Sequence, residues 1–104
     1  MSNARRIKIA EKFGRFPAGR SRNDGPFSGE AFRDQFLIKP LQQGEHLIID
    51  LNGTAGYGSS FLEEAFGGLV RAGLNREKII NQLEFESDDA SLIDEIEGYV
   101  RAAR

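Results

Sequence analysis

Two glycine-rich segments carry the side chains best suited to binding an anion. Residues 14–27 contain Arg20 and Arg22, and residues 52–60 end in a serine pair. Each segment follows an apolar stretch and precedes a helical pattern. In parallel sheets the connections that leave the strand ends gather at one edge, so we expect both segments and two helix starts to converge there. Helix N-termini offer unpaired N–H groups and partial positive charge, and such an edge would favour an anion.

The second segment offers a hydroxyl and an aromatic side chain in the run Tyr57-Gly58-Ser59-Ser60. It lacks the third glycine of a dinucleotide fingerprint and the lysine of a P-loop, so taken alone it is most simply a turn. Ser60 precedes Glu63 by three residues, which predicts a capping box. Ser59 is then the hydroxyl that is free to point outward. Asp50, at the end of an apolar strand, is either an acid placed at this edge or a buried carboxylate bonded to loop N–H groups.

The residue types that most enzymes and metal sites use are scarce. The chain has no cysteine and one histidine, His46, with no serine or cysteine nucleophile that visibly partners it. A catalytic triad and a metal centre are therefore unsupported. We expect no catalytic residues, no cofactor and no metal, and hence a protein that is not an enzyme.

Size and composition predict one soluble globular domain spanning residues 1–104. The apolar fraction is 39%, the charged fraction 29% and the net charge −2. A nucleic-acid binder usually carries a basic face, so that class is disfavoured. The longest apolar runs, such as residues 47–49, have three residues, far short of the roughly 20 needed to cross a bilayer. Without an apolar signal core at the N-terminus, we expect a cytoplasmic location.

Hydrophobic periodicity predicts alternating strands and helices. Strands are expected over residues 6–13, 46–51 and 80–86, each followed by a helix. The continuous apolar middle of residues 46–51 is typical of a strand covered on both faces. The order β-α-β-α-β-α with short returns implies an α/β fold, a small and mostly parallel sheet with helices packed on it.

Capping residues and helix breakers set the predicted helix limits. Ser28 is expected to be an N-cap, and Pro40 to end or kink the first helix near Ile38. The second helix is expected to run from Ser60 to a C-terminal cap at Gly73. Within it, the pair at residues 67–68 predicts close packing of this helix on the sheet.

Two stretches around the serine pair resemble a known family. The run Asp50-Leu51-Asn52-Gly53 and the later run Gly58-Ser59-Ser60-Phe61-Leu62 are similar to the STAS domain of sulfate transporters and anti-sigma-factor antagonists. The resemblance is closer to a bacterial STAS-like family of unknown function. It rests on Gly19-Arg20, Asp24-Gly25-Pro26, Ser28-Gly29-Glu30 and the long run 56–68, and it covers the chain from about Ile7 to Val100.

The resemblance implies a non-enzymatic regulatory module in bacterial signalling and control of transcription. In the antagonists the first serine of the pair is phosphorylated by a kinase-like ATPase, which changes partner affinity, and that serine corresponds to Ser59. Ser60 is the second candidate for the phosphoacceptor. This chain departs from their pattern, since Gly58 replaces an acidic residue and Phe61 replaces a glycine. The resemblance also implies a partner of the histidine-kinase ATPase type. The alternative is a small anion- or nucleotide-binding protein that uses Arg20, Arg22 and the helix starts.

Overall fold

Three parallel strands form the sheet of this protein, in the order β1-β2-β3. A computed structural model describes residues 4–104. The strands are β1 (Ala4–Lys8), β2 (His46–Asp50) and β3 (Leu83–Glu86). In the register, Ile7 lies opposite Ile49, and Ile49 lies opposite Phe85. Since all three strands run the same way, their carboxyl ends share one edge, and the predicted α/β class is confirmed.

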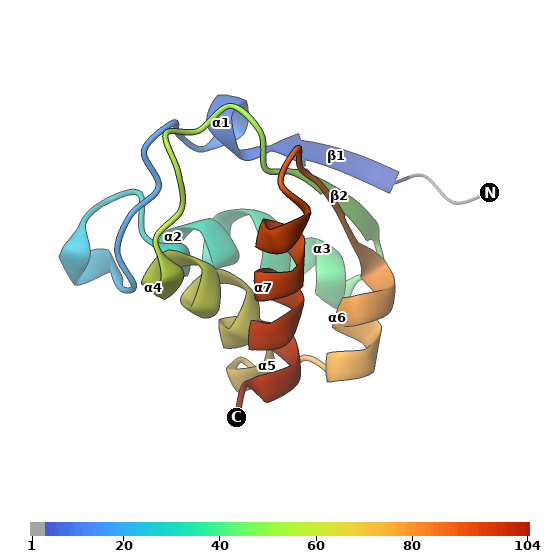
Figure 1. Cartoon of the computed structure of the whole chain (residues 1–104). Coiled ribbons are helices and arrows are strands. Elements are labelled where there is room, and N and C mark those ends of the chain that lie inside the picture. The colour runs from blue at the N-terminus through green and yellow to red at the C-terminus, as the bar shows by residue number, and fades with distance from the viewer. Residues whose placement is uncertain (1–3) are drawn as a thin grey trace.

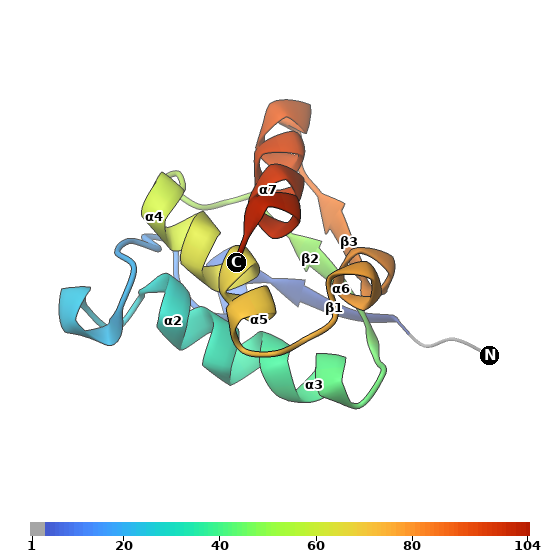
Figure 2. The same cartoon turned by 90° about the horizontal axis from the view of Figure 1, so that it is seen from below.

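Two long helical segments lie beneath the sheet, and each is interrupted by a π-helical turn (Figure 1, Figure 2). The first comprises α2 (Gly29–Phe32), η2 (Arg33–Leu37) and α3 (Ile38–Gln42), and the second comprises α4 (Ser59–Leu62), η3 (Glu63–Gly67) and α5 (Gly68–Arg71). We call them helix 29–42 and helix 59–71. The remaining helices are α1 (Ile9–Lys12), the 3₁₀ turn η1 (Arg22–Asp24), α6 (Arg76–Gln82) and α7 (Ala90–Ala102).

The core fills the space between one face of the sheet and these helices. Ile7, Leu47 and Ile49 point into it from the strands and are at most 4% exposed. The helices contribute large buried side chains, namely Phe32, Leu37, Phe61, Leu62, Phe66, Leu69 and Ile96. Residues at alternate positions, such as Arg6 and Ile48, point to the other face of the strands.

That other face of the sheet carries no helix (Figure 1). Ile48 is only half-buried there, and its neighbours in register, Arg6 and Glu84, are exposed. The prediction that the central strand is covered on both faces was therefore wrong. The apolar run at residues 47–49 is continuous because Ile48 is apolar. A single isoleucine among charged neighbours can remain half-buried, so it needs no helix to cover that face of the sheet.

The first strand ends earlier than predicted. Residues 9–12 form α1, and the N–H groups of Phe13 and Gly14 donate to the carbonyl oxygen of Ile9. Ile9 and Phe13 are four residues apart, a spacing that fits a helical turn as well as an alternating strand. The chain therefore leaves the sheet at Lys8.

The third strand begins later than predicted, because α6 occupies residues 76–82. Asn75 caps this helix, and its side chain accepts a hydrogen bond from the N–H of Lys78 at 3.1 Å. Ile79 and Leu83, four residues apart, both face the core. The asparagine N-cap was the available signal for this helix.

Helix 29–42 begins as predicted. Near Ile38 it does not end, but its geometry changes there from π-helical to α-helical. Ser28 is its N-cap, with the side-chain oxygen 3.1 Å from the N–H of Ala31. The helix continues through Pro40 to Gln42, immediately after the π turn. In that turn the N–H of Ile38 donates to Arg33, five residues back. This change in the backbone hydrogen bonds allows Pro40, which has no N–H, to lie inside the helix.

The glycine pair of helix 59–71 faces other helices, not the sheet. A Cβ added at Gly67 would lie 3.3 Å from the carbonyl oxygen of Tyr99, on α7. One added at Gly68 would lie 2.5 Å from Nη1 of Arg33, on helix 29–42. Close packing was correctly predicted at these positions, but its partner was wrong, since periodicity does not identify what a helix face contacts.

We expect Gly29→Ala to destabilise the protein by about 2–3 kcal/mol, because the new Cβ would lie 2.4 Å from the backbone oxygen of Phe61. Gly98→Ala in α7 is the matched control. No atom lies within 4 Å of a Cβ added at Gly98, so this change should raise stability by about 0.5–1 kcal/mol. Urea unfolding followed by circular dichroism measures both, and equal effects would contradict the close crossing at Gly29.

Candidate functional site

The loops after β1 and β2 lie side by side at the carboxyl edge of the sheet (Figure 1). The N–H of Ala55 donates to the carbonyl oxygen of Arg15 at 2.8 Å. Gly53, with a φ of +96°, brings its backbone against Ala10, where a Cβ would be 3.2 Å from that of Ala10. The two glycine-bearing segments therefore meet at one edge, as the parallel arrangement requires.

Asp50 holds the loop that leaves β2. It is 5% exposed, and its Oδ1 accepts a hydrogen bond from the N–H of Asn52 at 3.0 Å. Its Oδ2 accepts one from Nη2 of Arg6 at 3.0 Å. The side-chain oxygen of Asn52 in turn accepts from the N–H of Asp88 at 2.9 Å, which ties this loop to the one after β3. Asp50 thus has the buried, loop-bonded environment that was the second interpretation of the sequence.

Tyr57 fixes the approach to the second long helix. Its hydroxyl donates to the carbonyl oxygen of Leu51 at 2.8 Å, and its ring packs 5.9 Å from that of Phe61. Burial raises the pKa of the Tyr57 phenol to about 12, so it remains a hydrogen-bond donor at neutral pH. The peptide between β2 and α4 is therefore held at both ends.

The serine pair begins α4 and faces solvent. Gly58 is the N-cap, and it has no side chain with which to cap the helix. Ser59 and Ser60 are both exposed. The predicted capping box between Ser60 and Glu63 is absent, because the N-cap is Gly58, two residues before Ser60, and the carboxylate of Glu63 is bound by arginines.

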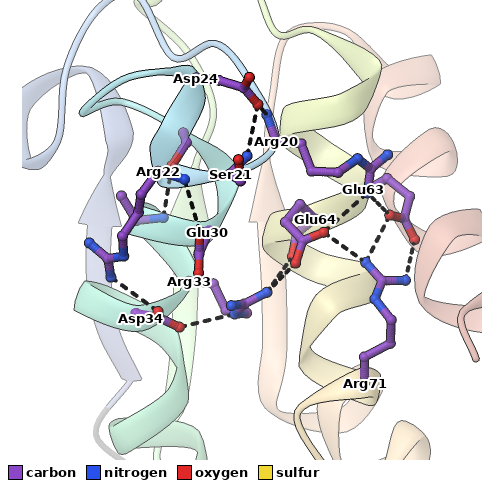
Figure 3. Close-up of polar contacts among 12 residues, drawn as sticks. Arg20, Ser21, Arg22, Asp24, Glu30, Arg33, Asp34, Glu63, Glu64 and Arg71 are labelled. Carbon is purple, nitrogen blue, oxygen red and sulfur yellow. Dashed lines mark hydrogen bonds and ion pairs between the residues drawn. The ribbon is translucent and has the colours of Figure 1, made fainter.

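Five charged residues form an ion network between loop 14–27 and the two long helices (Figure 3). Its members are Arg20, Arg33, Glu63, Glu64 and Arg71. Arg71 binds Glu63 with two bonds of 2.8 and 2.9 Å. Nη1 of Arg20 lies 3.1 Å from Glu64 and also bonds Glu63. Arg33, with 12% of its side chain exposed, bonds Glu64 from helix 29–42.

This network was missed from the sequence, where Glu63 and Glu64 suggested only capping and contact with solvent. Glu63 and Arg71 are eight residues apart, more than two turns of a regular α-helix. The π turn that begins at Glu63 holds more residues than a turn of α-helix does. It therefore brings the side chains of Glu63 and Arg71 onto one face of the helix. A spacing of eight between opposite charges was the only available signal, and it is a weak one.

The arginines keep both glutamates ionised. Hydrogen bonds from Arg71, followed by those from Arg20, lower the pKa of Glu63 to about 2. Burial of Glu64 opposes ionisation, but the bonds from Arg33 and Arg20 outweigh it, and the pKa of Glu64 is lowered. Neither carboxylate is therefore poised to exchange protons near neutral pH.

Arg22 is bound to helix 29–42, which is not the helix that carries the serine pair. Its Nη2 is 3.0 Å from Asp34, and its N–H donates to Glu30 at 2.8 Å, both on helix 29–42. Arg20 instead reaches helix 59–71. An anion at either guanidinium group would compete with carboxylates already in place, and the anion-binding role of Arg20 and Arg22 stays a prediction.

One family model matches this chain. The family model for a STAS-like domain of unknown function matches residues 28–92, more than half of the sequence. The chain belongs to this STAS-like family. No curated protein and no solved structure matches it significantly.

The matched part of this STAS-like domain contains most of the candidate site. Asp50, Tyr57, Gly58 and the serine pair fall within it, whereas Arg20 and Arg22 precede it. The loop of residues 51–58, between β2 and the serine pair, is called the serine loop. His46 is exposed at the opposite end of β2 from this loop. Within residues 4–104, no three His, Cys, Asp or Glu side chains are grouped to hold a metal, and no helix could cross a membrane.

We expect Glu63→Gln to lower the free energy of unfolding by about 1 kcal/mol at pH 7. The folded-state pKa is depressed, so this stability is complete above the ordinary pKa near 4.5 and is lost as the pH falls towards 2. The difference between wild type and variant should therefore shrink between pH 5 and pH 2.

Urea titrations at pH 7, 4 and 2.5 measure this difference. Glu84→Gln is the control, since Glu84 is exposed and forms no ion pair with another residue in the range 4–104. A pH-independent difference for Glu63→Gln, or an equal one for the control, would show that the network contributes no charge-dependent stability.

Proposed function

We propose that this STAS-like domain is a non-enzymatic regulatory module that binds a protein partner through the loops around Ser59, and that phosphorylation of Ser59 switches this binding. One observation carries the proposal: the hydroxyl of Ser59 is exposed at the start of a helix, while the polar groups beneath it are bonded to one another. A partner enzyme can reach that hydroxyl, and the loop that presents it is already fixed.

The neighbouring loop adds exposed aromatic side chains. Phe16 is 70% exposed, and it follows Arg15, whose carbonyl oxygen bonds the loop after β2. Phe27 is 43% exposed and packs edge-on to Phe13, with ring centroids 5.6 Å apart. Aromatic anchors of this kind carry much of the binding energy in protein interfaces. Their place beside the serine loop supports this edge as the partner surface.

A phosphate on Ser59 would act directly on the ion network. It adds a charge of about −1.5 to −2 and three acceptor oxygens. Ser59 and Glu63 are four residues apart on one helix, so their side chains are neighbours. Arg20, which bonds Glu63, would be drawn towards the phosphate while Glu63 is repelled. Loop 14–27 would then change its contacts with helix 59–71, which supplies a physical means of switching the surface.

The state of the acidic groups supports a module without catalysis. Asp50, Glu63 and Glu64 are each bound by an arginine, and hydrogen bonds lower the pKa of both glutamates. A general base needs a pKa near the working pH and a free path to its substrate. Glu63 and Glu64, which follow the serine pair on the same helix, do not meet that requirement.

To test the proposal, the protein is incubated with ATP and with a histidine-kinase-type ATPase, the class of partner that the family resemblance implies. We expect one phosphate on Ser59, found by peptide mass spectrometry, and a complex whose affinity changes at least tenfold on phosphorylation. Ser59→Ala should abolish the modification, whereas Ser60→Ala should retain it. Ser91→Ala, at an exposed serine on α7, is the control.

Phosphate on neither Ser59 nor Ser60, together with no complex by size-exclusion chromatography, would count against the proposal. Thermal shift with nucleotides and phosphate esters tests the anion-binding alternative. A ligand at 100 times its Kd would add about 2.7 kcal/mol of stability. A flat response across the panel would remove that alternative.

A further inference from the structure

The outer edge of β1 is open. β1 pairs with β2 on one side, and no strand among residues 4–104 pairs with the other. Figure 2 shows helix 29–42 passing along this side of the sheet, and α7 along the β3 side. An unpaired edge presents a row of backbone N–H and C=O groups to which another chain can add a strand.

A groove runs beside this edge, between β1 and helix 29–42. It has a volume of about 280 Å³ and is lined by Arg5, Arg6, Ile7, Lys12, Gln35, Phe36 and Pro40. Phe36, Ile7 and Pro40 supply apolar surface, and all three are at least half-buried. The other lining residues are polar, and three of them are cations. The groove thus combines backbone donors and acceptors, an apolar surface and positive charge.

The positive charge is a regional property of the chain. The first 40 residues contain nine Lys or Arg and four Asp or Glu, whereas the remainder contains five and twelve. Lys12 forms no ion pair with any residue in the range 4–104, and neither does Lys8 at the end of β1. Arg5 is paired with Glu45 but keeps 59% of its side chain exposed. This side of an acidic protein therefore has cations available to a ligand.

We propose that the β1 edge binds an extended, acidic segment of a partner protein by strand addition. The segment would form main-chain hydrogen bonds with β1. Its side chains would alternate between the face of the sheet that carries Arg5 and Ile7 and the face that carries Arg6 and Lys8. Acidic side chains would meet Arg5 on one face and Lys8 on the other, and apolar ones would contact Phe36.

A second copy of this chain is a weaker candidate for the occupant. β3 is itself an acidic edge, with Glu84 and Glu86, and its charge complements β1. The paired edges would be only four or five residues long, and α7 lies along β3. So short a contact falls below the roughly 1,000 Å² of a stable interface. A short peptide needs no more than this edge, since five or six residues can pair with it completely.

The proposed edge is distinct from the surface around Ser59. It is formed by β1, Lys12 and residues 35–40, whereas Ser59 begins helix 59–71, and no residue of that helix or of the loop before it lines the groove. Binding at β1 should therefore be unchanged in Ser59→Ala, which separates this inference from the proposed phosphorylation.

The test uses a fluorescent eight-residue peptide of alternating Glu and Val, blocked at both ends, titrated into the full chain. We expect a Kd in the micromolar range, weakened at least fivefold between 50 and 500 mM salt. Amide hydrogen exchange should slow at residues of β1. The alternating Lys and Val peptide, and the Glu and Val peptide with alternate backbone amides methylated, should each bind at least tenfold more weakly.

Variants of the protein locate the site. Lys12→Glu alone should weaken binding by about threefold to fivefold, and Arg5→Glu with Lys12→Glu by tenfold or more. The control pair Lys78→Glu with Arg101→Glu makes the same change in net charge at exposed residues outside the groove, and it should change the Kd less than twofold. Circular dichroism establishes that each variant is folded.

Three results would overturn the inference. The first is that the acidic peptide does not bind. The cations of β1 would then serve only to prevent other strands from pairing with this edge. Another is equal binding of the methylated peptide, which would show attraction by charge without strand addition. The third is a dimer in sedimentation equilibrium that Glu84→Lys dissociates and the peptide does not, which would make the second copy the occupant.

Discussion

The structure depends on one close crossing, where the backbone of Gly29 meets that of Phe61. No other residue type leaves enough room there, since a Cβ would lie 2.4 Å from the Phe61 oxygen. Because the two long helices touch at this point, Arg33 can reach Glu64 from one helix to the other. The N–H of Gly29 also donates to Gly19 at 2.9 Å, which anchors loop 14–27 at the same place. A single contact thus determines how the two long helices pack, where the ion network forms and where loop 14–27 lies.

A second chain of bonds holds the serine loop in position without help from the first. Asp50 binds the N–H of Asn52, and the side chain of Asn52 binds the N–H of Asp88. Connections that leave two neighbouring strands are thereby joined to each other. Tyr57 adds a bond back to Leu51, so the peptide before Ser59 cannot move freely away from the sheet. An exposed hydroxyl at the end of a loop fixed in this way can be recognised by shape, because little conformational entropy is lost when a partner binds it.

Features that depend on nearby residues were predictable, and features that depend on distant ones were not. The parallel α/β order, the strand at residues 46–50 and the cap at Ser28 follow from local periodicity and side-chain chemistry. The limits of the other strands were wrong because Ile9 with Phe13, and Ile79 with Leu83, fit two periodicities equally well. The capping box at Ser60 failed because Glu63 binds Arg20, 43 residues away in sequence. No local sequence pattern predicts such a bond, and none predicts the π turn that aligns Glu63 with Arg71.

A sheet with one bare face and an open edge needs a reason for remaining unpaired, because such surfaces attract other strands. Charge supplies one here. On the bare face the rows in register read Arg6, Ile48, Glu84 and Lys8, Asp50, Glu86, so positive and negative groups stand on opposite sides of β2. Arg6 neutralises this arrangement internally by bonding Asp50 and contacting Glu86. On this face the charges that remain unpaired among residues 4–104, such as those of Lys8 and Glu84, lie on the two outer strands of the sheet. The same separation of charge that suppresses indiscriminate pairing therefore makes the β1 flank selective for an acidic strand.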